Sequence, residues 1–306
     1  MTSRPLGRTG LTVSALALGT VALGVEYGIA APGEFGRPEE ADAIRLVHAA
    51  LDRGVTLIDT APAYGESERI VGRAAGRDRR AIIATKVTPP ISNSQSAIRI
   101  SLESSLRALD RDVLDIVQIH NATREMIAEG AVTDALLDAQ RRGLIRVLGA
   151  SVYGEDAAMA VIASGAYAVL QVALNALDQR MLRTVLPAAA AAGVGVIVRS
   201  AFLKGALTPK AQWLPEPLAP LRDAAARARD LLAGGSWDRL PDAAMRFCLS
   251  VPGVASVLTG ARTIRELDEA LAAEAAGPLD PAVFSSAAAL ALDEERLVNP
   301  SHWPVA

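Results

Sequence analysis

Short apolar runs recur along the chain, and each is followed by a longer segment in which apolar residues return at helical spacing. The runs show little alternation between apolar and polar positions, as is typical of parallel strands buried on both faces. We expect strands at residues 15–18, 57–59, 81–85, 113–119, 147–150, 169–174, 195–198 and 256–258. Eight strand–helix alternations within 306 residues predict the α/β class and a (β/α)8 barrel. The alternative is a doubly wound open sheet, but no G-x-G-x-x-G sequence follows the first strand.

Two of the intervening helices have recognisable ends. The first is expected to begin at Pro38, a favoured first helical position followed by two glutamates, and to end at Gly54. The second is expected to begin in the sequence SNSQ, where Ser92 and Gln95 fit a capping box, and to run to Leu109. Defined helix ends between the apolar runs support the alternating pattern.

The N-terminal segment permits two interpretations. Arg4 and Arg8 precede the sequence LTVSALALGTVALG, and together they resemble the basic and apolar regions of a signal peptide. The same residues fit a β-hairpin with its turn between Gly7 and Gly10, followed by a buried strand. We favour the hairpin, because the barrel needs its first strand at this point.

Two longer segments interrupt the alternation. Residues 200–235 form a proline-containing insertion followed by a charged, alanine-rich helix, and the tail after Gly277 contains a further helix and ends in NPSHWPVA. Long segments of this kind in compact domains often act as lids over a site. Both follow late strands, where the loops of a barrel face the active site, so we expect both to border it.

Composition narrows the range of functions. The chain is 51% hydrophobic with a mean hydropathy of +0.26, which suffices for one large core and predicts a single domain over residues 1–306. A net charge of −3 and a pI near 5.7 give no electrostatic basis for binding nucleic acid. No apolar stretch reaches the ~20 residues of a membrane span, so we expect a soluble protein. The lone cysteine, Cys248, is expected to be buried and inert, in keeping with a reducing, cytoplasmic location.

Polar residues occur where three consecutive predicted strands end. Asp59 closes the second strand, Lys86 and His120 follow the third and fourth, and Tyr64 lies in the loop beyond Asp59. Each has an ordinary structural interpretation, as a helix cap, a solvent-reaching lysine, a hydrogen-bonded histidine or a packed tyrosine. Adjacent strands nevertheless deliver all four to the rim where barrel active sites lie. A buried carboxylate is costly without a partner, so we expect Lys86 to pair with Asp59.

These four residue types suit proton transfer to a carbonyl oxygen. A buried ammonium beside a phenol stabilises the phenolate, so we expect Lys86 to lower the pKa of Tyr64 from about 10. A carboxylate would keep Lys86 charged, and His120 would polarise the carbonyl by donating a hydrogen bond. Because no suitable Ser or Cys nucleophile is visible, a hydride from a nicotinamide is the simplest companion to this proton. No metal enters the predicted site.

The sequence resembles the aldo-keto reductases over nearly its whole length. The matching stretches are LALGT, GVTLIDTAPAYGESERIVG, ATKV, SLESSLRALDRDVLDIVQIH, GLIRVLGAS, LQVALNALD, GVGVIVRSAFLKGAL and VPGVASVLTGARTIRELDEAL. The D-T-A-x-x-Y-G motif, followed by T-K and Q-I-H, is the specific part of the match. The resemblance implies a (β/α)8 barrel with an N-terminal β-hairpin and an extra C-terminal helix. It also implies that NADP(H) or NAD(H) is bound without a Rossmann motif, for the reduction of an aldehyde or ketone or the reverse oxidation of an alcohol or sugar.

The resemblance assigns roles to individual residues. Asp59, Tyr64, Lys86 and His120 match the catalytic tetrad of the family, with Tyr64 as the general acid or base. The residues that match its cofactor contacts are Gly19 and Thr20 at the first strand, Ser151 and Gln171 at the nicotinamide carboxamide, Ser200, Phe202, Leu203, Gly205 and Leu207 around the pyrophosphate, and Gly260, Ala261, Arg262, Arg265 and Glu269 near the adenosine.

The chain departs from the family pattern in its cofactor region. Val152 and Ala270 stand where asparagines are common, and Arg199 stands where an aromatic residue often stacks on the nicotinamide. We count Arg199 among the cofactor contacts, as a partner for pyrophosphate; an acidic substrate or a structural pair are the alternatives. Arg262 and Arg265 favour NADP(H) over NAD(H), since guanidinium groups suit a 2′-phosphate, although they also fit a helix face of paired surface charges.

The substrate is less closely defined. The expected lining residues are Val25, Tyr27, Asn121, Tyr153, Phe202, Trp213 and Trp303, a mixture that suits a small aldehyde, ketone or sugar. We expect Trp213 and Trp303 to close over it. Two other functions stay open: a Schiff-base aldolase using Lys86, against which the intact Tyr64 argues, and a cofactor-binding regulatory subunit without turnover.

Overall fold

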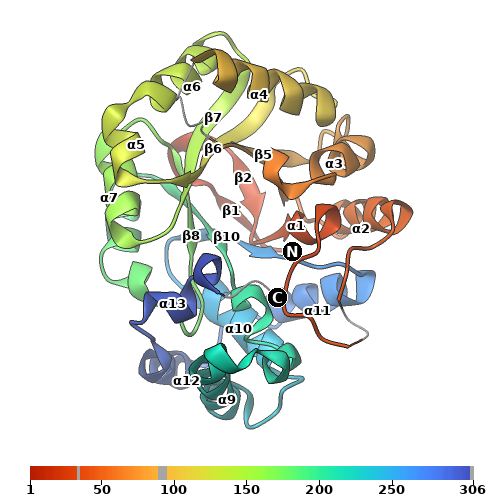
Figure 1. The fold of residues 1–306 in the computed structure, drawn as a ribbon, viewed down its shortest axis with the longest axis vertical. Helices are drawn as coiled ribbons and strands as arrows, with labels where there is room; N and C mark the ends of the chain where they lie inside the picture. The colour runs from red at the N-terminus through yellow and green to blue at the C-terminus, as the bar shows by residue number, and fades with distance from the viewer. Residues whose placement is uncertain (33–34, 89–94, 304–306) are drawn as a thin grey trace.

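Eight parallel strands close into a barrel in a computed structural model that describes residues 1–32, 35–88 and 95–303 (Figure 1). The strand order is β10-β3-β4-β5-β6-β7-β8-β9, so each strand lies beside its neighbours in sequence. The strands are β3 (Leu16–Gly19), β4 (Leu57–Asp59), β5 (Ile82–Val87), β6 (Leu114–Ala122), β7 (Ile145–Val152), β8 (Val169–Ala173), β9 (Gly195–Arg199) and β10 (Val254–Thr259). All eight predicted strands are confirmed, with boundaries that shift by a few residues.

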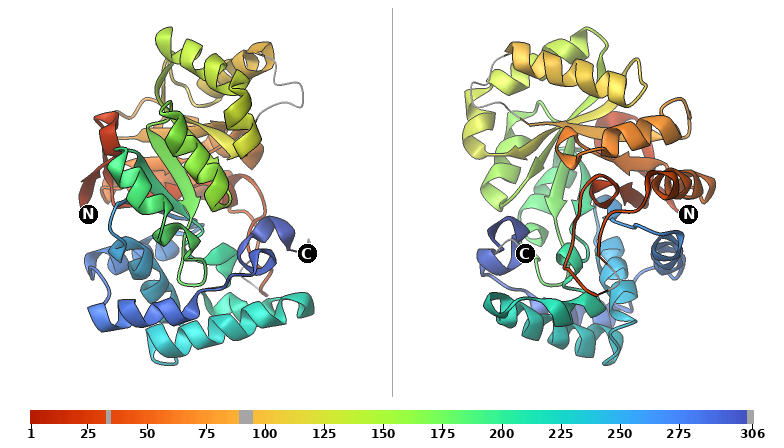
Figure 2. Two further views of the ribbon diagram at one scale, coloured as in Figure 1. Left: turned by 90° about the vertical axis from the view of Figure 1, so that its left-hand side faces the viewer. Right: turned by 45° about the vertical axis from the view of Figure 1, so that its right-hand side comes forward.

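Helices surround this barrel (Figures 1 and 2). They are α1 (Val21–Gly24), α2 (Glu40–Asp52), α3 (Ser67–Ala75), α4 (Gln95–Ala108), α5 (Arg124–Glu129), α6 (Ala131–Arg141), α7 (Glu155–Ser164), α8 (Val185–Ala191), α9 (Ala219–Ala233), α10 (Leu240–Ser250), α11 (Ile264–Ala275), α12 (Pro281–Ser286) and α13 (Glu295–Val298). None of the helices within the described ranges is long and apolar enough to cross a membrane.

The two helix starts predicted from sequence have different outcomes. α2 begins at Glu40, and Glu39 keeps an extended backbone with ψ of 149°, so Pro38 lies outside the helix and the prediction was wrong by two residues. The helix ends at Asp52, with Gly54 in a left-handed conformation just beyond it. α4 is seen from Gln95 to Ala108, while Ser92 and the proposed capping box lie outside the described residues.

The N-terminal residues form the predicted hairpin. β1 (Ser3–Pro5) and β2 (Thr12–Ser14) pair in antiparallel register. Three apolar side chains of this segment, Leu6, Leu11 and Val13, pack against the interior of the barrel. The hairpin therefore fills the N-terminal end of the barrel.

Side chains inside the barrel form layers, because alternate residues of each strand point inward. The layer next to the hairpin is apolar and includes Ala17, Leu57, Ala84, Ile116, Val147, Val169, Ile197 and Ala255. Two residues further along four of these strands stand buried polar residues, namely Asp59, Lys86, Gln118 and Gln171. The barrel thus has an apolar floor beneath a polar layer, which faces the C-terminal ends of the strands.

The two longer segments contain short helices. The insertion after β9 contains three 3-10 turns, η4 (Leu203–Gly205), η5 (Pro209–Trp213) and η6 (Glu216–Leu218), before α9 begins. The C-terminal extension is divided into α12 and α13, and α13 stops at Val298 shortly before Pro300. Figure 2 shows α9 beside the C-terminal helices at one end of the molecule, and α12 contacts α9.

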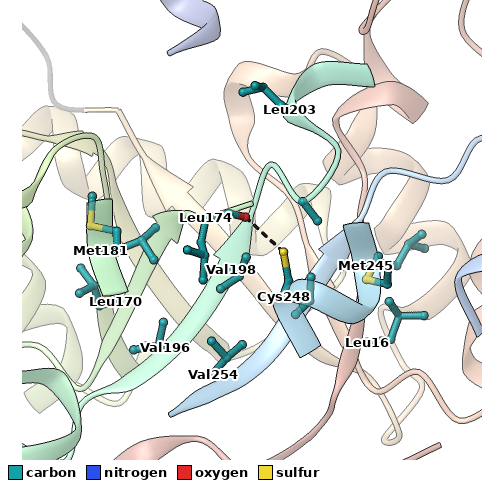
Figure 3. Packing of buried hydrophobic residues seen from close by; sticks show 14 of the residues in the cluster. Leu16, Leu170, Leu174, Met181, Val196, Val198, Leu203, Met245, Cys248 and Val254 are labelled. Carbon is teal, nitrogen blue, oxygen red and sulfur yellow. Dashed lines mark hydrogen bonds between the residues drawn. The ribbon is translucent and has the colours of Figure 1, made fainter. Parts of the chain in front are cut away.

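Cys248 lies on α10, and its side chain is buried in the core against the barrel. Figure 3 shows its side chain pointing toward the end of β8, where Sγ lies 3.4 Å from the carbonyl oxygen of Leu174. Burial raises the pKa of the Cys248 thiol far above its usual range. The thiol is therefore buried and protonated, which supports the predicted inert role.

Candidate active site

An ion pair lies at the centre of the polar layer. Nζ of Lys86 is 2.6 Å from Oδ2 of Asp59, and the two side chains are only 1% and 3% exposed. The same ammonium donates to the carbonyl oxygen of Thr60 at 2.9 Å. β4 and β5 are adjacent parallel strands, so the ends of both strands bring these charges together, as the sequence predicted.

Tyr64 and His120 complete the group. Nζ of Lys86 lies 4.9 Å from the centre of the Tyr64 ring, and the rings of Tyr64 and His120 meet edge to face at 5.7 Å. The carbonyl oxygen of Tyr64 packs so closely on Gly24 that a Cβ at Gly24 would overlap it. The absence of a side chain at this position of α1 therefore allows the backbone of Tyr64 to approach α1 closely.

The charges in this group act on one another. Burial acts to lower the pKa of Lys86, but Asp59 and Tyr64 together outweigh it and hold that pKa above its ordinary value. Burial raises the pKa of Tyr64, and the lowering effect of Lys86 is smaller. The prediction that Lys86 would bring the pKa of Tyr64 below its ordinary value was therefore wrong, because desolvation of the phenolate is the larger effect.

His120 is held neutral. Burial, followed by the charge of Lys86, lowers the pKa of His120 to about 4. One of its ring nitrogens, Nδ1, lies 3.5 Å from the hydroxyl oxygen of Thr88. At neutral pH the imidazole carries a single N–H, which is available for one hydrogen bond.

Two amides bind the far oxygen of the carboxylate. Nε2 of Gln171 donates to Oδ1 of Asp59 at 2.7 Å, and Oγ of Ser151 donates to Oε1 of Gln171 at 3.1 Å. Nε2 of Gln118 lies 3.2 Å from the same Oδ1. Gln118 belongs to the Q-I-H part of the motif, but the sequence analysis gave it no role in the site, although a lone amide within the apolar run IVQI is the kind of buried polar residue that signals a specific contact.

The loop after β9 has an unusual backbone. Ser200, Leu203 and Lys204 are non-glycine residues with φ of 63°, 44° and 56°. Asn175 stabilises the turn by donating from Nδ2 to the carbonyl oxygen of Ser200 at 3.1 Å. Phe202, with φ of −99° and ψ of 7°, precedes the two left-handed residues, and such a succession makes a concave surface of N–H groups that suits an anion. Asn175 and Lys204 are further residues that motif matching did not single out.

Arg199 crosses the mouth of the barrel from β9 to the loop after β7. Its guanidinium lies 3.9 Å from the centre of the Tyr153 ring and donates to the carbonyl oxygen of Val152 at 3.0 Å. A longer contact of 3.3 Å joins it to Oγ of Ser200. Arg199 therefore has local partners, while its charge also lowers the pKa values of Tyr64 and His120.

The residues expected at the adenosine end lie on and before α11. Arg262 forms an ion pair with Glu266 at 2.9 Å, and Arg265 forms one with Glu269 at 2.7 Å. The exposed pair of Arg265 and Glu269 lies on α11, as in the alternative interpretation of paired surface charges, whereas Arg262 precedes the helix and is only 13% exposed. Gly260 faces open space, since a Cβ added there would meet no atom within 4 Å.

The remaining predicted cofactor contacts lie at the strand ends or in the β9 loop. Gly19 pairs in register with Asp59, and Oγ1 of Thr20 donates to the carbonyl oxygen of Asp59 at 2.8 Å. The side chains of Leu203, Leu207 and Ala261 are buried, whereas Phe202 is partly buried. Gly205 packs beside Ile29, with φ of 108°. These residues supply shape and backbone groups to the site.

The expected substrate-lining residues lie in several places, and two of them lie beside the same lysine. Tyr27 and Trp303 come together around Lys204, whose Nζ is 5.8 Å from the centre of each ring. Tyr27 is 38% exposed, so part of its ring faces solvent. Val25 packs against Gly65, next to Tyr64, and Asn121 is an exposed residue with φ of 52°.

The two tryptophans differ in their surroundings. Trp303 is 8% exposed, and its Nε1 donates to the carbonyl oxygen of Leu297 at 3.2 Å. Trp213 is 55% exposed and lies on η5. In this conformation only Trp303 is packed against the mouth, beside Lys204.

Comparisons with known proteins agree with this geometry. A sequence profile described as the Aldo/keto reductase family matches residues 15–291. Aldo-keto reductase YhdN of Bacillus subtilis is 30% identical over 214 residues, which span 66% of this chain and 62% of that protein. L-galactose dehydrogenase of Arabidopsis thaliana is 28% identical, over 88% of this chain and 87% of the relative.

A solved structure extends the comparison to the whole chain. Aldo-keto reductase AKR11C1 from Bacillus halodurans, in its holo form, superimposes with a TM-score of 0.81 at 26% identity, covering 99% of both chains. The sequence profile covers most of this chain and includes the strands that carry Asp59, Lys86 and His120. The chain belongs to the aldo/keto reductase family.

Proposed function

We propose that this chain is an NAD(P)H-dependent oxidoreductase that reduces an aldehyde or ketone, or oxidises the corresponding alcohol or sugar, with Tyr64 as the proton donor. The observation that carries the proposal is the position of Lys86, whose ammonium is paired with Asp59 and lies against the ring of Tyr64. A phenol beside a buried ammonium that a carboxylate keeps charged is poised to release its proton as negative charge develops on a carbonyl oxygen.

Each of the four tetrad residues has its own role in the proposed carbonyl reduction. Tyr64 gives its hydroxyl proton to the carbonyl oxygen, and Lys86 stabilises the phenolate that remains. Asp59 keeps Lys86 charged in a site without water contact. The neutral imidazole of His120 donates one hydrogen bond to the same carbonyl oxygen and orients it toward Tyr64. In the oxidative direction Tyr64 acts as the base.

The chain has suitable groups for a nicotinamide dinucleotide, which when bound supplies or accepts the hydride. Ser151 and Gln171 offer a hydroxyl and an amide for the carboxamide, close to Asp59. The left-handed loop at Ser200, Leu203 and Lys204, together with Arg199, suits a diphosphate.

We propose a preference for NADP(H), with NAD(H) possible. Arg262 and Arg265 would bind a 2′-phosphate by exchanging their present glutamate partners for it. This exchange reduces the net binding free energy that the 2′-phosphate contributes, because each glutamate loses its arginine partner and needs a new one.

The residues at the mouth of the barrel indicate the kind of substrate that fits there. Tyr27, Tyr153 and Trp303 offer aromatic faces beside Arg199 and Lys204, which suits a small carbonyl compound or a sugar. We further propose that residues 1–306 act as one catalytic domain in the cytoplasm.

The hydroxyl of Tyr64 provides the most direct test. Tyr64→Phe should reduce carbonyl turnover by about three orders of magnitude or more while leaving NADPH affinity nearly unchanged, because the lost proton acts in the transition state. NADPH and NADH are titrated by fluorescence, and absorbance loss is followed with a panel of aldehydes, ketones and sugars.

Tyr167→Phe is the matched control. It removes a buried hydroxyl that bonds Thr133 and lies outside the proposed site, so turnover should stay at the parental level. Parental turnover in Tyr64→Phe would refute the assigned proton donor. Tight nucleotide binding without turnover of any carbonyl would favour the regulatory alternative, and tighter binding of NADH than NADPH would contradict the proposed preference.

A further inference from the structure

Gln118 lies within the polar layer beside the proposed proton donor. It is fully buried at the centre of β6, with Nε2 3.2 Å from Oδ1 of Asp59. Gln171 donates to the same oxygen, while Lys86 donates to Oδ2. The Asp59 carboxylate is therefore held by one ammonium and two amides, which restricts its rotation and its choice of partner.

The two amides differ in the surroundings of their carbonyl oxygens. Oε1 of Gln171 accepts a hydrogen bond from Ser151, whereas Oε1 of Gln118 has no partner among the residues that the structure describes. A buried amide oxygen without a partner costs free energy. An apolar side chain of the same length would avoid that cost, so stability alone does not account for an amide at this position.

The neighbouring strands make room for this amide. Gly149 of β7 is in register with Gln118, and a Cβ at Gly149 would lie 3.1 Å from Cγ of Gln118. On the other side Gln118 is in register with Lys86 of β5. The amide thus occupies space left by a missing side chain and lies directly beside the charged pair.

We propose that Gln118 is a positioning residue for proton transfer, whose amide holds the Asp59 carboxylate oriented so that Lys86 stays charged and directed at Tyr64. The inference rests on the function proposed above. The amide has one favourable orientation, because its oxygen would be repelled by the carboxylate that its nitrogen binds. Gln118 touches neither substrate nor reacting atoms, and it acts only through Asp59 and Lys86.

Gln118→Met removes the amide and keeps the length of the side chain. We expect kcat to fall about tenfold to a hundredfold, the effect of losing a hydrogen bond to a charged group, with little change in KM for the carbonyl or in NADPH affinity. Activity should also be lost at a higher pH on acidification, because the buried charged pair then has one hydrogen-bond donor fewer to stabilise it. The midpoint of urea unfolding should stay close to the parental value, since the orphaned oxygen is removed as well.

Gln118→Glu places a second carboxyl group beside Oδ1 of Asp59. Two carboxyl groups at this separation share a proton, and losing that proton leaves two negative charges beside one ammonium. Activity should therefore fall as the pH rises, opposite to the shift expected for Gln118→Met. Opposite displacements of the two pH profiles would identify an electrostatic role, which a side chain that only fills space would not produce.

Thr133→Val is the control, because it removes another buried hydrogen bond on α6 and should leave the pH profile unchanged. Parental rates and parental pH profiles in both Gln118 variants would overturn the inference, and Gln118→Met alone decides it if the glutamate variant does not fold. Tyr64→Phe separates the two proposals. Turnover that survives in Tyr64→Phe overturns the proposed function itself, whereas lost turnover there with unaffected Gln118 variants overturns only the role of Gln118.

Discussion

Two sets of ion pairs in this protein lie in contrasting surroundings. Lys86 and Asp59 form an isolated pair inside the barrel, 1% and 3% exposed. Arg77 and Arg80 lie on the surface after α3 and are 63% and 54% exposed. Their partners are Asp110 and Asp112 for Arg77, and Asp52 and Asp78 for Arg80.

The contrast shows that the number of ion pairs in a region is a poor guide to what they contribute to stability or to the proposed chemistry. The surface arginines each bind two carboxylates, but water and salt screen these charges and the side chains lose entropy when they pair. The buried pair has a large desolvation cost, which an apolar replacement would avoid. Its position at the strand ends suits the chemistry proposed for Tyr64, where a fixed positive charge away from water is useful.

The largest expected effect comes from breaking the buried pair. Asp59→Asn leaves the Lys86 ammonium without its counter-charge, and we expect the free energy of unfolding to fall by about 3–5 kcal/mol. The double variant Asp59→Asn with Lys86→Met should recover most of that stability, because no buried charge remains, while carbonyl reduction stays abolished. Urea unfolding of the parent, both single variants and the double variant gives the coupling energy. Strictly additive losses would contradict the description of a coupled buried pair.

An intermediate effect is expected from His120, which lies beside the buried pair but is neutral. Its pKa is lowered to about 4 in the folded protein, whereas the unfolded chain has its ordinary value near 6.5. The unfolded chain therefore binds the proton first. Stability due to neutral His120 is complete above about pH 6.5 and is lost as the pH falls toward 4, by roughly 1–3 kcal/mol.

His120→Gln should flatten the stability profile between these pH values, and nuclear magnetic resonance of the parent should show the imidazole titrating well below pH 6. A His120 resonance that titrates near pH 6.5 would show that the imidazole is not held neutral by burial and Lys86. His48→Gln serves as the control on the surface of α2, where Nε2 of the imidazole lies 3.0 Å from the carbonyl oxygen of Ala74.

The smallest effect is expected on the surface. Arg77→Ala removes both ion pairs of that arginine, yet the unfolding midpoint should shift by no more than the error of the measurement at physiological salt. Any difference seen at low ionic strength should vanish as salt is added. A large loss of stability that persists in high salt would mean that this exposed cluster behaves like the buried pair.

Much of the architecture was predictable because it depends on local patterns. Unalternating apolar runs between helical segments identified the eight strands, since strands covered on both faces need apolar residues throughout. The positions of Asp59, Lys86 and His120 at consecutive strand ends then predicted their convergence, because parallel strands of a barrel end on one rim. Pro38 was misassigned because the backbone of Glu39, rather than the proline itself, decided where α2 begins.

Other features depend on distances between segments that no local pattern contains. The net direction of the Tyr64 pKa shift is the result of burial opposing Lys86, and only the folded structure sets the balance.

The sequence by itself determined the barrel and the identity of the four residues proposed for the chemistry, because strand periodicity and strand-end position are properties of neighbouring residues. The tertiary structure alone decided that Gln118 of β6 and Gln171 of β8 converge on Asp59 of β4, and that Gly149 leaves room for one of them. Such contacts join residues far apart in the chain. Their energies arise from burial and mutual distance, which only closure of the barrel establishes.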